Sequence, residues 1–596
     1  MRALVMPFRS AALAAAWVLA AAMLFGAGEA RAQPAPAAAP PPAVTFTKQW
    51  SDADRATFYT TGQGSRMMPA AWFMALRRLD VDQPFAADQL ARYGYLHNDG
   101  AGNLPVGFVV EARTGQLGMT CAACHTGQME YTSKDGVNHV LRIDGAPASA
   151  DFQQFLVDLT AAARATLSQP DRFDTFAKTV LGNGYTATKA AQLKSQFSDW
   201  LKPFGAFMDA SLPPSPWGPA RLDAFGMIFN RVAGLDLNIP SNVISANAPV
   251  SYPFVWNASR QDHTQWNGGV PNGLFVQALA RNSGEVFGVF GEFSPAKTPV
   301  PGLISYRNNS VDFAGLQTLE EKIAVLQPPQ WPSDLAEVNA QLAQQGGVLF
   351  NQYCGGCHGE TTSPLLKSAW LTPVKAVGTD PKMYNNAARQ SDPGIYTGML
   401  LPPPALGVFV NPASTKDMLA SSVIGAILND AATAVTPISK LRNGVWRAIR
   451  RDLGDLSDNQ FNLLANAEAA AEFKSRIQAR LSGLFTEPAG ADAGAAYESR
   501  VLHGIWATSP YLHNGSVPNL WELMKPAKDR VKTFNVGCRK FDAKNVGFVS
   551  DDPSCKTGTF VVDPNNANGN GNGGHEFGTN LSEDDRWAIV EFLKQY

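Results

Sequence analysis

Two short motifs, CAACH at residues 121–125 and CGGCH at residues 354–358, constrain this chain more than any other feature. In a Cys-x-x-Cys-His motif the two thiols can form thioethers with the vinyl groups of a haem, and the histidine then supplies a nitrogen to the iron. The motifs therefore predict two sites of covalent haem c attachment, at Cys121, Cys124 and His125 and at Cys354, Cys357 and His358. A thioredoxin-like redox pair and half of a zinc site are the alternatives, but neither requires a histidine directly after the second cysteine.

The first residues have the pattern of an export signal. A basic start, MRALVMPFRS, precedes an apolar stretch and an Ala-Arg-Ala cleavage signal that ends at Ala32. We expect a signal peptide at residues 1–32 and an extended Ala/Pro linker at 33–45; a retained membrane anchor is the alternative. No later segment reaches the roughly 18 uninterrupted apolar residues of a spanning helix. We therefore expect a mature protein that is periplasmic or secreted and has no membrane association, and haem c attachment outside the cytoplasm agrees with export.

The net charge and the two cysteines outside the haem motifs give information on binding partners and on disulfide bonds. The net charge is −2 and charged residues make up 17% of the chain, so no basic surface for nucleic acid is predicted. The haem motifs use four of the six cysteines and leave Cys538 and Cys555. In an oxidising compartment we expect these two to form a disulfide, which is worth about 3 kcal/mol for so short a loop.

The pattern of helices around the motifs predicts the fold class. A helix at 335–350 leads into the second motif, and another at 581–596 begins with a Ser582 cap signature. A helix before the motif and one at the C-terminus enclose the haem in a small cytochrome c. We expect a mainly α-helical protein with long irregular loops and little β structure, made of two cytochrome c-like haem domains at residues 46–330 and 331–596.

The second axial position of each iron decides the chemistry, because a filled position restricts a haem to electron transfer and an open one lets peroxide or dioxygen bind. For the C-terminal haem we favour His575, in the Gly/Asn-rich stretch NNANGNGNGGHEFG, and His513 and Tyr497 remain alternatives. For the N-terminal haem we favour an open position, with His139 as the alternative ligand.

Two further passages, YESRVLHGIWATSPYLHNGSVPNL at 497–520 and QWNGGVPNGLFVQALARNSGE at 265–285, accompany the haem motifs. Together they resemble the bacterial diheme cytochrome c peroxidase superfamily, which includes MauG and the diheme rubber oxygenases. The stretches GQGSRMMPAAWF, LPVGFVVEA and GGHEFG look most like the rubber oxygenase branch.

The resemblance implies catalytic roles for Trp266, Gln277 and Glu285. In the superfamily a tryptophan bridges the haems for electron transfer, and a glutamine and a glutamate lie in the peroxide pocket, where a carboxylate can act as general acid and base. It also implies a calcium ion between the domains, although no acidic loop is distinctive enough to assign its ligands.

The chain departs from the superfamily at several positions. Ala496 and Tyr497 stand where ordinary diheme peroxidases offer a methionine to the C-terminal haem, which favours a histidine ligand as in rubber oxygenases. Gln265 precedes the tryptophan where an aromatic residue is common. Phe254 and Phe275 are candidates for the phenylalanine that the oxygenases place over the reactive haem.

Three functions follow from these observations. The first is a peroxidase-like enzyme that activates peroxide or dioxygen at the N-terminal haem and receives electrons, through the C-terminal haem, from a small redox protein. The second is a rubber-oxygenase-like dioxygenase that cleaves polyisoprene or another hydrophobic alkene. The third is a diheme electron carrier without catalytic activity.

Overall fold

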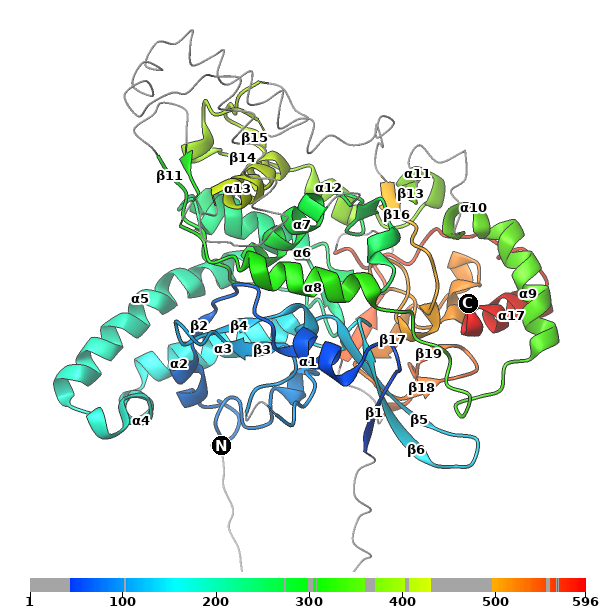
Figure 1. The fold of residues 1–596 in the computed structure, drawn as a ribbon, viewed down its shortest axis with the longest axis horizontal. Coiled ribbons are helices and arrows are strands. Elements are labelled where there is room, and N and C mark those ends of the chain that lie inside the picture. The colour runs from blue at the N-terminus through cyan, green and yellow to red at the C-terminus, as the bar shows by residue number, and fades with distance from the viewer. Residues whose placement is uncertain are drawn as a thin grey trace, which may run out of the picture. The chain divides into compact units, whose positions relative to one another are not determined.

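A computed structural model describes residues 43–596 except 101–102, 273–274, 298–303, 307, 360–369, 402–406, 430–495, 554–557, 564 and 566–567. Residues from Val44 to Tyr596 form one compact unit (Figure 1). The predicted signal peptide and nearly all of the predicted linker lie outside the described residues. In the described ranges, no helix is both long and apolar enough to cross a bilayer.

The expectation of a mainly α-helical fold with little β structure was wrong. Among the described residues 42% are helical and 16% lie in strands, so the fold is mixed. The strands form nine small sheets, each of two or three strands. Most of these strands are two to four residues long, too short for an alternating pattern of apolar side chains to appear in the sequence. They hold together stretches that the sequence analysis treats as loops.

The longest hairpin follows the first haem motif directly. Strands β5 (Thr126–Thr132) and β6 (Asn138–Asp144) pair antiparallel, and β1 (Val44–Phe46) adds to β6 in parallel. Before the motif, β4 (Gln116–Met119) pairs with β3 (Phe108–Val110) and with β2 (Met68–Pro69). The motif therefore lies at a junction between two sheets, which fixes both of its ends.

A layer of long helices packs beside these sheets. It consists of α3 (Phe152–Ser168), α4 (Pro170–Leu181) and α5 (Ala187–Ser211), which contact one another in pairs. These helices carry a large part of the apolar core of this region. Apart from the two helices beside the second motif, the other α-helices of six or more residues in the described ranges are α1 (Asp52–Thr60), α2 (Ala70–Ala75), α6 (Ala224–Phe229), α7 (Phe275–Gly288), α8 (Phe313–Val325), α12 (Lys382–Ala387) and α13 (Thr415–Asn429).

The second motif lies at the end of a helix pair. Helix α9 (Ala340–Tyr353) leads into α10 (Gly355–His358), and α17 (Glu583–Gln595) packs closely against α9 (Figure 1). A Cβ atom at Gly346 would lie 1.9 Å from the carbonyl oxygen of Ala588, so only glycine allows this approach. Ser582 caps α17 by accepting a bond from the backbone N–H of Asp585 at 3.1 Å. Both helices predicted around the second motif are confirmed.

One apolar core spans the predicted boundary between residues 330 and 331. It contains Trp256 and Leu319 from before the boundary and Phe350, Trp506 and Ile589 from after it. The division into two haem domains stays a prediction. The two motif regions nevertheless share a continuous packed interior, which keeps the distance between them constant.

Candidate functional site

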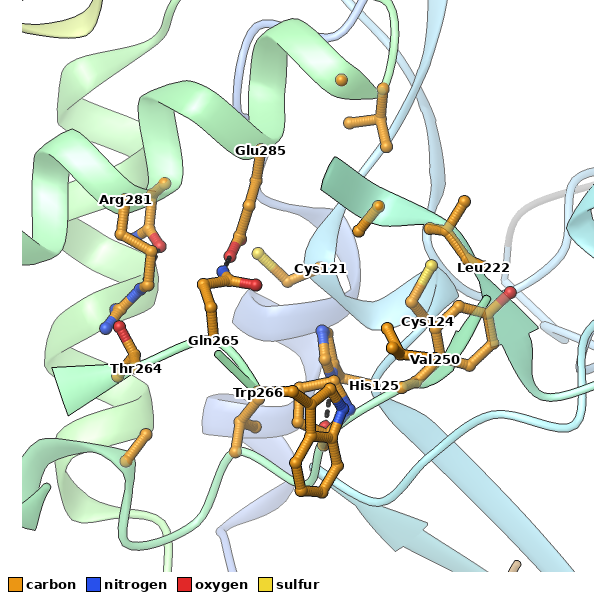
Figure 2. A pocket seen from close by; sticks show the side chains of 18 of the residues that line it. Cys121, Cys124, His125, Leu222, Val250, Thr264, Gln265, Trp266, Arg281 and Glu285 are labelled. Carbon is orange, nitrogen blue, oxygen red and sulfur yellow. Dashed lines mark hydrogen bonds between the residues drawn. The ribbon is translucent and has the colours of Figure 1, made fainter. Parts of the chain in front are cut away.

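The first haem motif lines a cavity of about 1310 Å³, which includes space open to solvent (Figure 2). Cys121, Cys124 and His125 enter it from the short helical turn that follows β4. Thr120 begins this turn by accepting a bond from the backbone N–H of Ala122 at 3.3 Å. Both cysteines are free thiols, as attachment to a haem requires.

His125 is oriented by its outer ring nitrogen. Nδ1 lies 2.8 Å from the carbonyl oxygen of Pro253, to which it donates in the tautomer that leaves Nε2 as a free lone pair. Burial lowers the pKa of His125 to about 4, so the ring is neutral at pH 7. A neutral imidazole held through Nδ1 is the form that binds a metal.

One wall of this cavity is polar and ionisable. The side-chain amide of Gln265 donates to Glu285 Oε1 at 2.7 Å, and Figure 2 shows the Glu285 carboxylate pointing into the cavity toward it. Arg281, one turn before Glu285 on α7, pairs with Glu320 of α8 and donates to Asn272 Oδ1 at 2.7 Å. Burial raises the pKa of Glu285, although Arg281 and Gln265 partly oppose the shift. This wall can store and release a proton inside the cavity.

Another part of the lining is apolar and includes Leu222, Ala224, Met227, Ile228 and Val250. Leu222 belongs to strand β7 (Arg221–Leu222), Val250 belongs to strand β8 (Val250–Ser251), and the two are paired across this small sheet. The first cavity therefore combines an apolar face with an acid-bearing face.

The structure separates the residues that the family resemblance grouped together. Glu285 lines the first cavity, whereas Gln277 is buried on α7 and is not among the residues that line either cavity. Gln265 provides the amide next to Glu285 instead. Phe254 lines both cavities and stacks on Trp256, with ring centroids 4.9 Å apart. The side chain of Phe275 lies outside the described residues.

Trp266 lines both cavities and so lies between them. Its indole N–H donates to the carbonyl oxygen of Ser251 at 2.8 Å, and its own carbonyl accepts from the backbone N–H of Glu498 at 2.8 Å. Beside it, the buried guanidinium of Arg500 lies 5.7 Å from the Trp266 ring centroid and 4.1 Å from that of Phe254. The indole and the backbone of Trp266 are therefore both held in place between the two cavities, and its role as an electron bridge stays a prediction.

The second haem motif lines a cavity of about 1550 Å³. Its cysteines and histidine are arranged as those of the first motif are. Cys354 and Cys357 are free thiols, and His358 Nδ1 lies 2.8 Å from the carbonyl oxygen of Arg500. Burial lowers the pKa of His358, which again leaves a neutral imidazole with Nε2 free.

A second histidine faces His358. The ring centroids of His358 and His575 are 6.1 Å apart. An iron between two imidazoles has a nitrogen at roughly 2 Å on each side, and the ring centres lie behind those nitrogens, so this spacing leaves room for one metal ion. Burial lowers the pKa of His575 to about 3, and it too is neutral at pH 7.

The two alternatives to His575 have other arrangements. The Tyr497 hydroxyl donates to the carbonyl oxygen of Asp380 at 2.7 Å, and the His513 ring packs against the Tyr497 ring in a tilted arrangement with centroids 4.3 Å apart. His139 lies on the β5–β6 hairpin, stacked on Tyr131 with centroids 5.0 Å apart, and does not line the first cavity. In the described part of the chain, His125 is the only histidine that lines the first cavity.

Both donor sets fit a covalently attached haem c. Each offers two free thiols and one neutral imidazole whose outer nitrogen is already bonded to a carbonyl, all facing one large cavity. Four residues of these sites, Arg281, Glu320, Glu498 and Arg500, were not predicted from the sequence, and Gln265 was noted there only as a departure from the superfamily. Arg281, Glu498 and Arg500 lie inside the two passages that carry the family resemblance, whereas the sequence gives no signal for Glu320.

The remaining predicted sites are described in part. Cys538 is disulfide-bonded, and Cys555, its expected partner, lies outside the described residues. Within the ranges that the structure describes, no group of three or more His, Cys, Asp or Glu side chains could hold a metal ion, and calcium stays a prediction.

Comparison with known proteins gives one family match and two relatives. Residues 496–535 match the RoxA-like, cytochrome c-like family, which is the family of the rubber oxygenases. The y4iJ protein of Sinorhizobium fredii is 30% identical over 606 residues, 92% of this chain and 93% of y4iJ. The y4iM protein of the same organism is 35% identical over 349 residues, 58% of this chain and 60% of y4iM. Both relatives are described as uncharacterized. The matches support the rubber oxygenase part of the predicted resemblance and do not extend to the diheme peroxidase and MauG superfamily.

Proposed function

The chain belongs to the family of y4iJ and contains a RoxA-like, cytochrome c-like segment, and from this premise we propose that it is an exported diheme c-type oxidoreductase. It activates peroxide or dioxygen at the N-terminal haem site and passes electrons through the C-terminal haem site. Its location is periplasmic or secreted, and a small redox protein is its electron donor.

The observation that carries this proposal is the difference between the two cavities. His575 faces His358 in the second cavity, whereas His125 is the only histidine lining the first among the described residues. A haem with a histidine on both sides passes electrons, and a haem with an open side can bind an exogenous ligand. The pairing of these two environments in one chain supports one reactive and one relay site.

The residues of the first cavity can transfer protons to and from a bound substrate. When bound, the haem supplies the iron at which peroxide or dioxygen is reduced. The Glu285 carboxylate would accept a proton from hydrogen peroxide and return it to the oxygen that leaves as water, as a general base and then a general acid. Gln265 fixes the orientation of that carboxylate through its 2.7 Å bond. Arg281, held by Glu320, keeps a positive charge beside the developing negative charge.

Trp266 connects the two sites. Its indole lines both cavities and donates to the Ser251 carbonyl oxygen, while its main-chain carbonyl accepts from the Glu498 N–H, so both the ring and the backbone of Trp266 are held in place. An aromatic ring in this position shortens the gap that an electron has to cross between the sites.

A second candidate function is cleavage of polyisoprene or another hydrophobic alkene by dioxygen. Two observations favour it: the RoxA-like match at residues 496–535 and the apolar wall formed by Leu222, Met227, Ile228 and Val250. The ionisable wall around Glu285 favours the first candidate, because addition of dioxygen to an alkene does not need a proton donor of this kind.

Four measurements test the proposal on the purified, haem-loaded protein. Haem content and carbon monoxide titration should give two haems and one bound carbon monoxide per chain. Fewer than two haems would contradict the proposal of a diheme protein. Two haems that bind no carbon monoxide would leave only an electron carrier. Oxidation of a reduced small cytochrome by peroxide supports the first candidate. Oxygen uptake with polyisoprene latex, in the absence of peroxide turnover, supports the second.

A further inference from the structure

A buried arginine contacts the segment that carries His575. The Arg530 side chain is 2% exposed and makes five hydrogen bonds, all to main-chain carbonyl oxygens. Three of these oxygens belong to Asn572, Gly574 and His575, at 2.7, 2.9 and 3.1 Å. A guanidinium has five N–H donors in a rigid plane, so Arg530 uses its full capacity and most of it on this segment.

The segment 572–575 has a backbone that is costly to hold. Gly574 has φ 69° and His575 has φ 50°. Both values lie in the left-handed region, which is unfavourable for residues other than glycine. A Cβ atom at Gly574 would lie 2.3 Å from the carbonyl carbon of Gly378, and the His575 N–H donates to the carbonyl oxygen of Val377 at 2.8 Å. The chain is thus pressed against residues 377–378 on one side, and Arg530 holds its carbonyl groups on the other.

The remaining hydrogen bonds of Arg530 connect it to a helix that lines the same cavity as His575. Arg530 donates to the carbonyl oxygens of Leu523 and Lys525, at and just after the end of α16 (Leu520–Leu523), at 3.3 and 3.1 Å. Leu520 and Leu523 line the second cavity together with His575. The Glu522 carboxylate accepts from the Val531 backbone N–H at 2.9 Å, which fixes the residue after Arg530 to the same helix.

We propose that Arg530 is a positioning residue that sets the axial ligand of the second haem by holding the backbone of 572–575 so that His575 faces His358. This inference rests on the proposed function, in which His575 is that ligand. Lysine cannot replace arginine here, because a single ammonium has three donors at one point and cannot reach five oxygens spread over two segments.

The test compares three variants of the haem-loaded protein: Arg530→Lys, His575→Gly and Arg231→Lys. Arg231 is the matched control, because its guanidinium is also buried and donates to main-chain carbonyl oxygens, those of Phe287 and Gly291, far from residues 572–575 in the sequence and without a hydrogen bond to them. Low-temperature paramagnetic resonance and carbon monoxide titration report the ligand state of each haem, and thermal unfolding reports the loss of stability.

We expect His575→Gly to convert the second haem from low spin to high spin and to raise bound carbon monoxide from one to two per chain, with added imidazole restoring the low-spin signal. Arg530→Lys should give the same change in a large part of the molecules. Arg231→Lys should lower the unfolding temperature and leave both haem signals as in the parent protein. In the double variant, Arg530→Lys should add nothing to the spectrum of His575→Gly, because it acts through that ligand.

The outcomes separate this inference from the proposed function. If His575→Gly leaves the second haem low spin, the assignment of the ligand in the proposed function fails. If His575→Gly changes the signal and Arg530→Lys only lowers the unfolding temperature, as Arg231→Lys does, the positioning role is overturned and the ligand assignment stands. If Arg530→Lys does not fold, Arg530→Gln, which keeps two donors, is measured by the same criteria.

Discussion

The two haem cavities are alike on one side and different on the other. In each, the motif histidine lies 2.8 Å from a main-chain carbonyl oxygen through Nδ1, Pro253 for His125 and Arg500 for His358, and two free thiols lie nearby. The opposing walls differ, since the second presents His575 and the first presents Glu285 with Gln265. The motif sides of the two cavities therefore cannot explain a difference in chemistry. The variants predicted below change residues on the opposing walls or on the segments that connect and support them.

The largest expected effect is the loss of proton transfer in the first cavity. Glu285→Gln keeps the shape and the contact to Gln265 but removes the group that accepts a proton. We expect peroxide turnover to fall by about 10²- to 10⁴-fold, the usual contribution of general acid and base catalysis, measured as oxidation of a reduced cytochrome. The control is Glu292→Gln, an exposed partner of Arg66 that does not line the cavity, which should keep the parent rate.

His575→Gly removes the feature that distinguishes the second cavity. Because the second iron then has one open side, the carbon monoxide bound per chain should rise from one to two, and peroxide should react at both sites. His139→Gly is the matched control, since His139 stacks on Tyr131 in the β5–β6 hairpin and lines neither cavity. An unchanged titration in His575→Gly would show that His575 does not close the second site, and the assigned difference between the two cavities would fail.

Trp266→Phe tests the connection between the cavities. Phenylalanine is a poorer electron relay and loses the 2.8 Å bond to Ser251, so electron transfer between the haems should slow while both haem spectra stay as in the parent. Stopped-flow reduction of the first haem through the second measures this step. Trp331→Phe loses a comparable indole bond, to Ala336 at 2.9 Å, outside both cavities, and should not slow it.

The pH dependence of turnover sharpens the role of Glu285. Burial raises the pKa of this carboxyl above its ordinary 4.5, with Glu320 adding to the shift and Arg281 and Gln265 opposing it. The carboxylate is the form that accepts a proton, so turnover should fall as the pH drops through the raised pKa. Glu285→Gln should lack this acidic limb. Burial raises the pKa of Glu498 to about 7. If the fall in turnover occurs near pH 7 and is absent in Glu498→Gln, the titrating group is Glu498 and not Glu285.

The smallest expected effect concerns the backbone beneath His575. Alanine at a left-handed position costs about 1–2 kcal/mol, which applies equally to Gly136→Ala and Gly574→Ala, at φ 83° and 69°. Only Gly574 meets another atom, the carbonyl carbon of Gly378 at 2.3 Å, whereas nothing lies within 4 Å of a Cβ at Gly136. Denaturant unfolding should show a larger loss for Gly574→Ala, and this variant alone should alter the second haem spectrum.

Local covalent chemistry made part of the site readable from the sequence. Cys-x-x-Cys-His brings two thiols and an imidazole together within one turn of chain, so the attachment residues of both sites could be named before any fold was known. The helices α9 and α17 were also predictable, because fourteen and thirteen residues are enough for an apolar face and a cap to appear. The short strands were not, because two residues carry no periodicity, and the predicted fold class was wrong for that reason.

The opposing walls are a property of the tertiary structure alone. Glu285 meets Gln265 because α7 contacts β10 (Val270–Pro271), which pairs with β9 (His263–Thr264) directly before Gln265. The resemblance, which placed Gln277 in the same pocket as Glu285, could not show that Gln277 does not line the cavity. His575 meets His358 because Arg530 and residues 377–378 hold the loop that carries it. The sequence by itself determined which residues offer two thiols and a histidine as one donor set, since those residues are neighbours along the chain. The tertiary structure decided which side chains face each donor set, since those contacts join segments that are distant along the chain and depend on how the chain packs.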